Sequence, residues 1–433
     1  MRRYESYKDS GVEWLGEVPS HWDMQRSKFI FKKIERKVNE EDQIVTCFRD
    51  GQVTLRANRR TEGFTNALKE HGYQGIRKGD LVIHAMDAFA GAIGISDSDG
   101  KATPVYSVCL PHNKQKIDVY FYAYYLRNLA LSGFISSLAK GIRERSTDFR
   151  YADFAELLLP IPPYLEQQKI AQFLDDKTAK IDQAVDLAEK QIALLKEHKQ
   201  ILIQNAVTRG LNPDVPLKDS GVEWIGQVPE HWSVKKIKHV TSKIGSGITP
   251  LGGGSNYIDG GIPLLRSQNI HFDRIDLNDV ARISEFTHNS MKNSKVRKGD
   301  VLLNITGGSL GRCFYVDSNE EMNVNQHVCI IRPNKKINTI FLNMLLASEI
   351  GQKQIWFFQQ GGGREGLNFQ AIKNFYLPLP DLEEQQKIAI YLDKQAAKID
   401  QAIALKTAYI EKLKEYKSVL INDVVTGKVR ISV

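Results

Sequence analysis

Apolar residues recur with a helical period in two long stretches of this chain. Between Glu166 and about Arg209 there is no proline or glycine, and apolar side chains return about every seven residues. This first stripe consists of Leu174, Ile181, Ala188, Leu195 and Leu202. The second, between Glu384 and about Thr426, consists of Leu392, Ile399, Ile403, Ile410, Leu413 and Leu420. The spacing predicts two long amphipathic helices, the first about 65 Å long if unbroken.

Each stripe would be exposed to water if its helix stood alone. Two helices of similar length in one chain can bury their stripes against each other as an antiparallel pair. The sequence therefore predicts coiled-coil-like spacer helices that hold two globular domains at a set separation. The apolar positions assigned to spacing and partner docking are Leu174, Ile181, Leu195, Leu202, Leu392, Ile399, Leu413 and Leu420.

The helices belong to a tandem duplication. Lys8–Trp22 returns nearly unchanged as Lys218–Trp232, and Leu159–Ala171, with its Leu-Pro-Ile-Pro and Glu-Gln-Gln-Lys-Ile-Ala blocks, returns as Leu377–Ala389. The period is far longer than the roughly 20 to 50 residues of solenoid repeats. Each copy is therefore expected to be a domain followed by its long helix.

A third pair of matching segments lies inside the domains. Arg77–Ile83 corresponds to Arg297–Leu303, and both segments are expected to form a turn that enters a buried strand. Residues 33–70 and 243–290, by contrast, share almost nothing although they lie between matching blocks. Function is therefore expected to differ between the two copies in these segments.

The short apolar runs inside each domain predict a mixed α/β fold. Strands are expected at Leu81–His84, Val105–Leu110, Val301–Ile305 and Val328–Ile331, and helices at Asp118–Leu131 and Asn338–Gln354. The predicted boundaries are 1–158 for the first domain, 159–211 for the central proline segment and its helix, 212–376 for the second domain and 377–433 for the last proline segment and helix.

Composition adds a preference for an anionic partner. The formal charge of +8 and the pI near 9.0 favour a polyanion such as nucleic acid, while 42% hydrophobic residues is typical of a globular protein. No apolar run approaches the roughly 18 residues of a membrane span. We therefore expect a soluble cytoplasmic protein with no membrane partner.

The four cysteines indicate buried thiols in a reducing compartment. Cys47, Cys109, Cys313 and Cys329 form no Cys-x-x-Cys pair. When the alignment of Arg77–Ile83 with Arg297–Leu303 is extended without insertions, Cys109 and Cys329 occupy equivalent positions, each after a valine. We expect these thiols to pack in the core and to form neither disulfides nor metal sites.

Catalytic signatures are absent from the sequence. It has no phosphate-binding P-loop, no His-Glu-x-x-His and no paired His/Cys spacing. Ile161-Pro-Pro-Tyr164 resembles the Asx-Pro-Pro-aromatic motif of amino-methyltransferases, but isoleucine replaces the polar residue that would bind the target amine. The prediction is a chain with no catalytic residue, metal or cofactor of its own.

Arginine, asparagine and glutamine gather beside glycines in both copies, and these side chains suit contacts to base edges and phosphates. A charged surface run is often only a solvated face, so each residue is a candidate. The candidates are Arg56, Asn58, Arg59, Arg60, Lys140, Arg143, Arg145, Arg150, Arg266, Gln268, Asn269, Arg364 and Asn368. The repeated Trp14, Trp22, Trp224 and Trp232, with His21 and His231, are expected to pack instead.

With both Gly-Val-Glu-Trp blocks and both Pro–helix blocks, the chain resembles the specificity subunit of type I restriction–modification enzymes. The resemblance implies two target-recognition domains that each read one half of a bipartite double-stranded DNA target. It also implies helices that dock two modification (methyltransferase) subunits, and further restriction (translocase/nuclease) subunits. Adenine methylation with S-adenosylmethionine, and translocation and cleavage with ATP and Mg, would belong to those partners.

The second domain carries more of the motifs of that family. They are Gly247-Ile-Thr-Pro250, Ile262–Ile270, Gly299-Asp300 and Asn325-Gln326. Thr249 therefore joins the DNA-binding candidates, and the first domain lacks its counterpart. A free-standing DNA-binding regulator or a scaffold protein without such partners remains the alternative.

Overall fold

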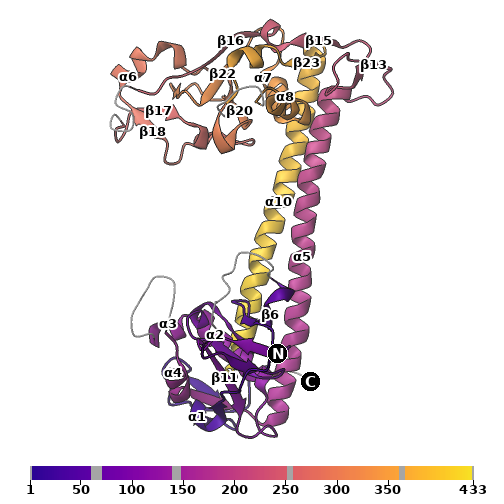
Figure 1. The fold of residues 1–433 in the computed structure, drawn as a ribbon. Helices are drawn as coiled ribbons and strands as arrows, with labels where there is room; N and C mark the ends of the chain where they lie inside the picture. Colours follow the sequence, from indigo (N-terminus) through magenta and orange to yellow (C-terminus); the bar gives the residue numbers. More distant parts are fainter. Residues whose placement is uncertain (1, 60–70, 139–147, 251–256, 360–365, 432–433) are drawn as a thin grey trace. The chain divides into compact units, whose positions relative to one another are not determined.

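The computed structural model describes residues 2–59, 71–138, 148–250, 257–359 and 366–431. The chain divides into two compact units (Figure 1). Unit 1 comprises Met1–Glu189 and Ala408–Val433, and unit 2 comprises Lys190–Thr407. Each unit therefore contains one globular part together with a section of both long helices.

Unit 1 is built around an antiparallel sheet with the strand order β4-β11-β8-β9. These strands are β4 (Phe31–Lys33), β11 (Tyr106–Pro111), β8 (Leu81–His84) and β9 (Ile93–Ile95), and α2 (Val119–Leu131) packs on the sheet. Paired strands β1 (Tyr7–Asp9) and β2 (Glu17–Pro19), β3 (Asp23–Arg26) and β12 (Leu158–Ile161), β5 (Val45–Cys47) and β6 (Val53–Leu55), and β7 (Gln74–Ile76) and β10 (Gly100–Ala102) surround it. The short helices are α1 (Ser27–Ile30), η1 (Arg56–Asn58), η2 (Ala88–Ala90), α3 (Phe134–Leu138) and α4 (Tyr151–Glu156).

Unit 2 repeats this sheet with the order β16-β22-β19-β20. The strands are β16 (Thr241–Ser246), β22 (Val328–Pro333), β19 (Val301–Asn304) and β20 (Cys313–Tyr315). A second sheet holds β18 (Ala281–Ile283), β17 (Ile262–Leu265) and β21 (Asn323–Val324), and two pairs join β13 (Leu217–Asp219) to β14 (Gln227–Pro229) and β15 (Ser233–Lys236) to β23 (Tyr376–Leu379). The helices are η3 (Ile237–His239), η5 (Ser267–Asn269), α6 (Glu285–Ser290), η6 (Lys292–Ser294), η7 (Gly307–Ser309), α7 (Thr339–Ala347), α8 (Glu349–Gln359) and α9 (Phe369–Lys373). The predicted mixed α/β class in two tandem copies is confirmed.

One predicted helix of unit 2 is interrupted. The sequence pattern indicates a single helix over Asn338–Gln354, but Ser348 has extended backbone angles and separates α7 from α8. Its hydroxyl donates to the carbonyl of Leu345 at 2.7 Å. At Gly351 a Cβ atom would lie 2.3 Å from the Leu346 oxygen, so only glycine permits the tight turn between the two helices.

The proposed equivalence of two cysteines is wrong by two residues. In unit 1 Cys109 pairs with Leu81, whereas the counterpart of Leu81 in unit 2, Val301, pairs with Ile331. The segment that joins the two strands is thus two residues longer in the second copy. The thiols are nevertheless buried as predicted, and burial raises the pKa of Cys109 and Cys329 to about 12.

The two long helices are α5 (Tyr164–Arg209) and α10 (Leu382–Val425), and they pack against each other within each unit (Figure 1). In unit 1 Lys417 contacts Asp182 at 2.7 Å. In unit 2 Lys406 donates to Gln191 at 2.6 Å, and Lys199 contacts Asp400 at 2.7 Å. Because residue numbers fall along α10 as they rise along α5, the pair is antiparallel, as predicted.

The predicted apolar stripes lie where the helices pack. Leu174, Ile181, Leu392, Ile399 and Leu420 are buried, while Leu195, Leu202 and Leu413 are partly buried. Their assignment to spacing and partner docking stays a prediction.

A buried glutamine fastens the start of α5 to the globular part of unit 1. The Gln167 side-chain oxygen accepts the backbone N–H of Asp118 at 2.8 Å. Its amide nitrogen donates to the carbonyls of Pro162 at 2.7 Å and Lys116 at 3.0 Å. One side chain therefore satisfies three backbone groups, two of them in the segment that leads into α2.

Gln385 makes the same contacts at the start of α10 in unit 2. It accepts the backbone N–H of Asn338 at 2.8 Å and donates to the carbonyls of Pro380 at 2.9 Å and Lys336 at 3.2 Å. This glutamine is the middle residue of the repeated Glu-Gln-Gln block. Its contacts give a physical reason for the repetition of that block.

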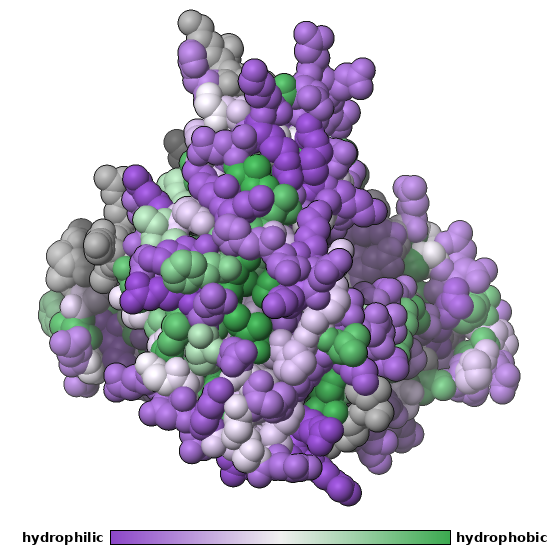
Figure 2. All heavy atoms as spheres, turned by 90° about the horizontal axis from the view of Figure 1, so that it is seen from below, coloured by the Kyte–Doolittle hydropathy of each residue, from purple (hydrophilic) through white to green (hydrophobic). Residues whose placement is uncertain are grey.

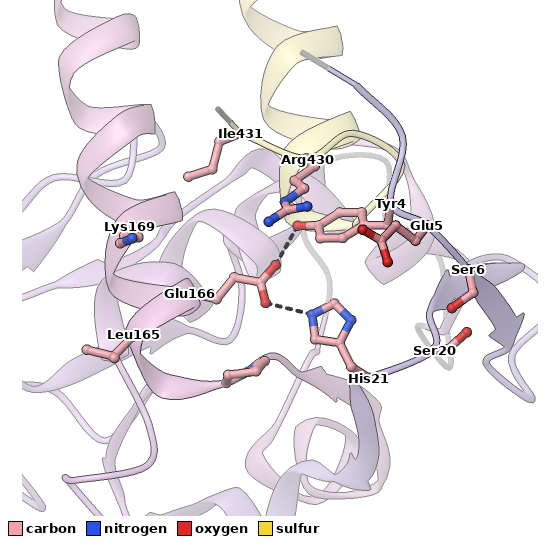
Figure 3. A pocket seen from close by; sticks show the side chains of 11 residues that line it. Tyr4, Glu5, Ser6, Ser20, His21, Leu165, Glu166, Lys169, Arg430 and Ile431 are labelled. Atoms are coloured by element: carbon pink, nitrogen blue, oxygen red, sulfur yellow. Dashed lines mark hydrogen bonds and ion pairs between the residues drawn. The ribbon is translucent and has the colours of Figure 1, made fainter. Parts of the chain in front are cut away.

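The glutamate before each glutamine binds a repeated histidine. His21 Nε2 lies 2.8 Å from Glu166 Oε2, and the Tyr4 hydroxyl donates to Glu166 Oε1 at 2.5 Å (Figure 3). In unit 2 His231 Nε2 lies 2.8 Å from Glu384 Oε2. The neighbouring residues Trp22 and Trp232 are 0% and 1% exposed, which confirms that this pair of tryptophans packs in the core.

Polar side chains cover most of the face seen in Figure 2, where apolar side chains gather in patches among them. Within the described ranges, no helix is both long enough and apolar enough to cross a membrane.

Replacing Gln385 by alanine is expected to lower the free energy of unfolding by about 2 kcal/mol, because one backbone N–H and two backbone carbonyls lose their partner, and the bond to the Pro380 carbonyl is buried. Gln386→Ala is the matched control: this neighbouring glutamine is exposed, and its loss is expected to cost less than about 0.5 kcal/mol. Urea unfolding of the purified variants measures both. Equal losses in the two variants would contradict the fastening role.

Candidate nucleic-acid interface

The loop that follows the strand of the third pair of matching segments occupies the same position in both units. It comprises residues 85–92, after β8, in unit 1 and residues 305–312, after β19, in unit 2. We call this loop, together with the segments that contact it, the loop edge. In unit 2 the Leu367 N–H donates to the Ile305 carbonyl at 2.8 Å, and in unit 1 the Phe149 N–H donates to the Ala85 carbonyl at 3.1 Å. Phe149 and Leu367, which follow the candidates Arg145 and Arg364 along the chain, therefore return to equivalent places.

Four polar side chains form a chain of hydrogen bonds at the loop edge of unit 2. The Thr249 hydroxyl donates to Gln326, whose amide nitrogen lies 3.0 Å from His327 Nε2. His327 Nδ1 lies 2.7 Å from the Thr306 hydroxyl. If each group donates to the next, the ring hydrogen of His327 is on Nδ1. Hydroxyl, amide and imidazole groups are the types that recognise base edges.

The predicted Arg266–Asn269 segment lies beside the same loop as η5. Buried Asn304 donates to the Ser267 carbonyl at 2.7 Å and so joins this turn to the end of β19. Gln268 is exposed, and Arg266 lies over the Tyr257 ring at 5.6 Å. Asn269, however, is 2% exposed, and its amide binds the Arg266 N–H and the Asp276 carbonyl, each at 3.0 Å. Its side chain closes the turn and does not face solvent.

Close glycine contacts build the loop edge of unit 1. The β5–β6 hairpin packs on the segment that follows β8 so tightly that a Cβ at Gly94 would lie 1.9 Å from the Gly51 oxygen. A Cβ at Gly91, whose φ is +90°, would lie 2.8 Å from the Arg49 oxygen. Side chains larger than hydrogen are excluded at both positions, so the hairpin is held against the loop.

Three predicted candidates follow this hairpin. Arg59 forms an ion pair with Asp50 at 2.6 Å and lies over the Phe48 ring at 4.3 Å. Asn58 donates to Thr54 at 2.8 Å, and Arg56 Nε donates to Thr46 at 3.3 Å. The structure thus brings these candidates together at the tip and base of one hairpin.

The remaining candidates divide by position. Arg150 is exposed and binds Asp148 at 2.8 Å. Asn368 is exposed and caps α9 by accepting the Ala371 N–H at 2.7 Å. Outside the described residues lie Arg60, Lys140, Arg143, Arg145 and Arg364.

Sequence reasoning missed three charged or titratable side chains of unit 1. Arg49 Nη2 donates to Asp87 Oδ1 at 2.8 Å, and the Asp87 N–H donates to His84 Nδ1 at 3.1 Å. Burial lowers the pKa of His84, although the nearby Asp87 carboxylate opposes the shift. The one available signal was the position of Arg49 inside the divergent segment 33–70.

The side chains described here include no cluster of three or more histidine, cysteine or carboxylate groups placed to hold a metal ion.

Comparison with known proteins assigns this architecture. A family described as "Type I restriction modification DNA specificity domain" matches residues 28–196 and again residues 229–415. The chain belongs to this family. The resemblance stated from the sequence is confirmed, and this specificity subunit contains two DNA specificity domains.

Two curated relatives illustrate the similarity. The MjaVIII specificity subunit of Methanocaldococcus jannaschii is 29% identical over 73% of this chain and 72% of the relative. The EcoBI specificity subunit of Escherichia coli is 31% identical over 58% of this chain and 55% of the relative.

Solved structures support the fold. A chain from a study titled as the structural basis of complex assembly and conformational transition of the type I R-M system has a TM-score of 0.72 at 15% identity, covering 95% of this chain and 99% of that one. The HsdS subunit from Thermoanaerobacter tengcongensis has a TM-score of 0.56 at 17% identity, with 95% and 98% covered.

His84 is expected to make this specificity subunit less stable as the pH falls below about 6.5. The unfolded chain then binds a proton that the folded imidazole resists, so stability is present above that pH and is lost below it. The variant His84→Gln should show a flatter dependence of unfolding free energy on pH between 5 and 7. Exposed His112→Gln is the control and should keep the wild-type slope. An unchanged slope in His84→Gln would refute the assignment.

Proposed function

We propose that this chain gives a type I restriction–modification complex its DNA specificity, with each specificity domain reading one half of a bipartite double-stranded target. The observation that carries the proposal is the loop edge: the same frame in both units presents different polar side chains. Two small readers on one chain multiply specificity without enlarging either interface.

The side chains assigned to DNA lie at or near the two loop edges. In unit 1 they are Arg56, Asn58, Arg59 and Arg150, and in unit 2 they are Thr249, Arg266, Gln268 and Asn368. Arg60, Lys140, Arg143, Arg145 and Arg364 belong to the same assignment by sequence alone. Lysine and arginine contacts to phosphates supply affinity, and contacts to base edges supply discrimination.

The long helices are assigned two tasks. Their packed stripes set the spacing of the two half-sites, and their outer faces dock two modification subunits. Large apolar side chains that remain exposed on α5 and α10 support the docking, because soluble proteins rarely leave many large apolar side chains exposed to water unless a partner covers them. They include Leu165, Leu187, Leu194, Ile201, Leu382, Ile390, Leu405, Tyr409, Tyr416 and Val419, each between 49% and 70% exposed.

The chemistry is assigned to the partners. Modification subunits would methylate adenine with S-adenosylmethionine, and restriction subunits would translocate and cut DNA with ATP and Mg in the cytoplasm. This chain would act as a non-catalytic subunit, with domain limits at 1–158, 159–211, 212–376 and 377–433.

Single-molecule sequencing of adenine methylation tests the proposal in cells with and without this gene, with the partner genes expressed. We expect one split motif to disappear when the gene is deleted and to return when it is restored. Unchanged methylation would contradict the proposal and would favour a free-standing regulator or a scaffold.

A further inference from the structure

Arg49 occupies the tip of the β5–β6 hairpin, at the loop edge of unit 1. Its side chain is 61% exposed, and it lies in the segment where the two copies of the repeat diverge. The backbone beneath it is fixed, because Gly91 and Gly94 let the hairpin approach the loop within distances that no Cβ atom would permit. Arg49 is therefore an exposed side chain on a rigid base.

Two contacts fix the orientation of its guanidinium group. Nη2 donates to Asp87 Oδ1 at 2.8 Å, and the guanidinium carbon lies 5.8 Å from the centre of the Phe89 ring. Asp87 is itself held, since its backbone N–H donates to His84 Nδ1 at 3.1 Å. Among the described residues, no hydrogen bond is made by Arg49 Nε or Nη1. Nη2 keeps a second N–H group, which is parallel either to Nε–H on one edge or to Nη1–H on the other, so one parallel pair of N–H groups is left for a ligand.

We propose that Arg49 recognises a guanine in the half-site read by unit 1, donating two parallel hydrogen bonds to the O6 and N7 atoms in the major groove. The inference rests on the proposed function and deepens it. A planar fork held by a carboxylate matches these two acceptors, and this pairing is the commonest specific contact of arginine with DNA.

The second copy lacks this device. Gly307 occupies the position equivalent to Asp87, and Asn304 the position equivalent to His84. The same edge of unit 2 carries the chain of hydroxyl, amide and imidazole groups from Thr249 to Thr306 instead. A carboxylate-held arginine at this position thus belongs to the first domain, and its loss should affect one half-site.

The first test compares adenine methylation motifs in cells that express the partner subunits with the wild-type chain, Arg49→Gln or Arg49→Lys. Both variants should make one guanine position of one half-site degenerate and leave the other half-site unchanged, because lysine keeps the charge but lacks the planar fork. Arg26→Gln is the control: this exposed arginine of β3 pairs with Glu156 at 2.5 Å, and its variant should keep the full motif.

A second test changes the DNA, so that its main comparison uses only the wild-type chain. The purified wild-type complex is titrated with a duplex that contains the motif found by methylation sequencing. It is also titrated with the same duplex carrying 7-deazaguanine at the guanine position that the Arg49 variants make degenerate. Loss of N7 should weaken wild-type binding about tenfold. The Arg49→Gln complex should bind both duplexes equally.

The outcomes separate the two proposals. Absence of any split motif with the wild-type chain would remove the proposed function itself. A split motif that Arg49→Gln leaves intact, or a motif in which Arg49→Lys keeps the guanine, would overturn the inference alone. Equal weakening on all sequences, with no 7-deazaguanine effect in the wild type, would make Arg49 a phosphate contact and also overturn it.

Discussion

The buried glutamine at the start of each long helix is the constraint on which the rest of this structure depends. Gln167 and Gln385 each form hydrogen bonds with three backbone groups, and the bonds to the Pro162 and Pro380 carbonyls are buried. Each one joins the first turn of a long helix to the segment before α2 or α7, so a helix and its domain are held as one piece. Under the proposed function, a change in the paired helices would reach each domain through these contacts.

This frame separates what the two copies share from what they do not. The histidine–glutamate contacts, the buried tryptophans and the four-stranded sheets repeat, whereas the loop edges differ in charge and hydrogen-bonding groups. Unit 1 presents an arginine held by a carboxylate, and unit 2 presents a chain of hydroxyl, amide and imidazole groups from Thr249 to Thr306. A duplicated scaffold with unlike edges fits the proposal that each domain reads a different DNA half-site.

The sequence predicted the parts of this molecule that have a period. The stripes gave the antiparallel α5–α10 pair, and the repeat gave the sheet strands. Contacts between distant residues have no such signal. Asp87 and Arg49 meet only through the hairpin packing that Gly91 and Gly94 permit, and Asn269, a DNA candidate by type, is used to close a turn. Likewise, an alignment of the two copies without insertions does not reveal that the segment between β19 and β22 is two residues longer than the segment between β8 and β11.

The most direct test lengthens both helices by seven residues, after Ala188 in α5 and after Ile410 in α10, between the Asp182–Lys417 and Gln191–Lys406 contacts. One heptad keeps the stripes aligned and adds about 10 Å, or about three base pairs of B-form DNA. Methylation sequencing should then show the same two half-sites with a spacer about three base pairs longer. An unchanged spacer, or altered half-site sequences, would contradict the account.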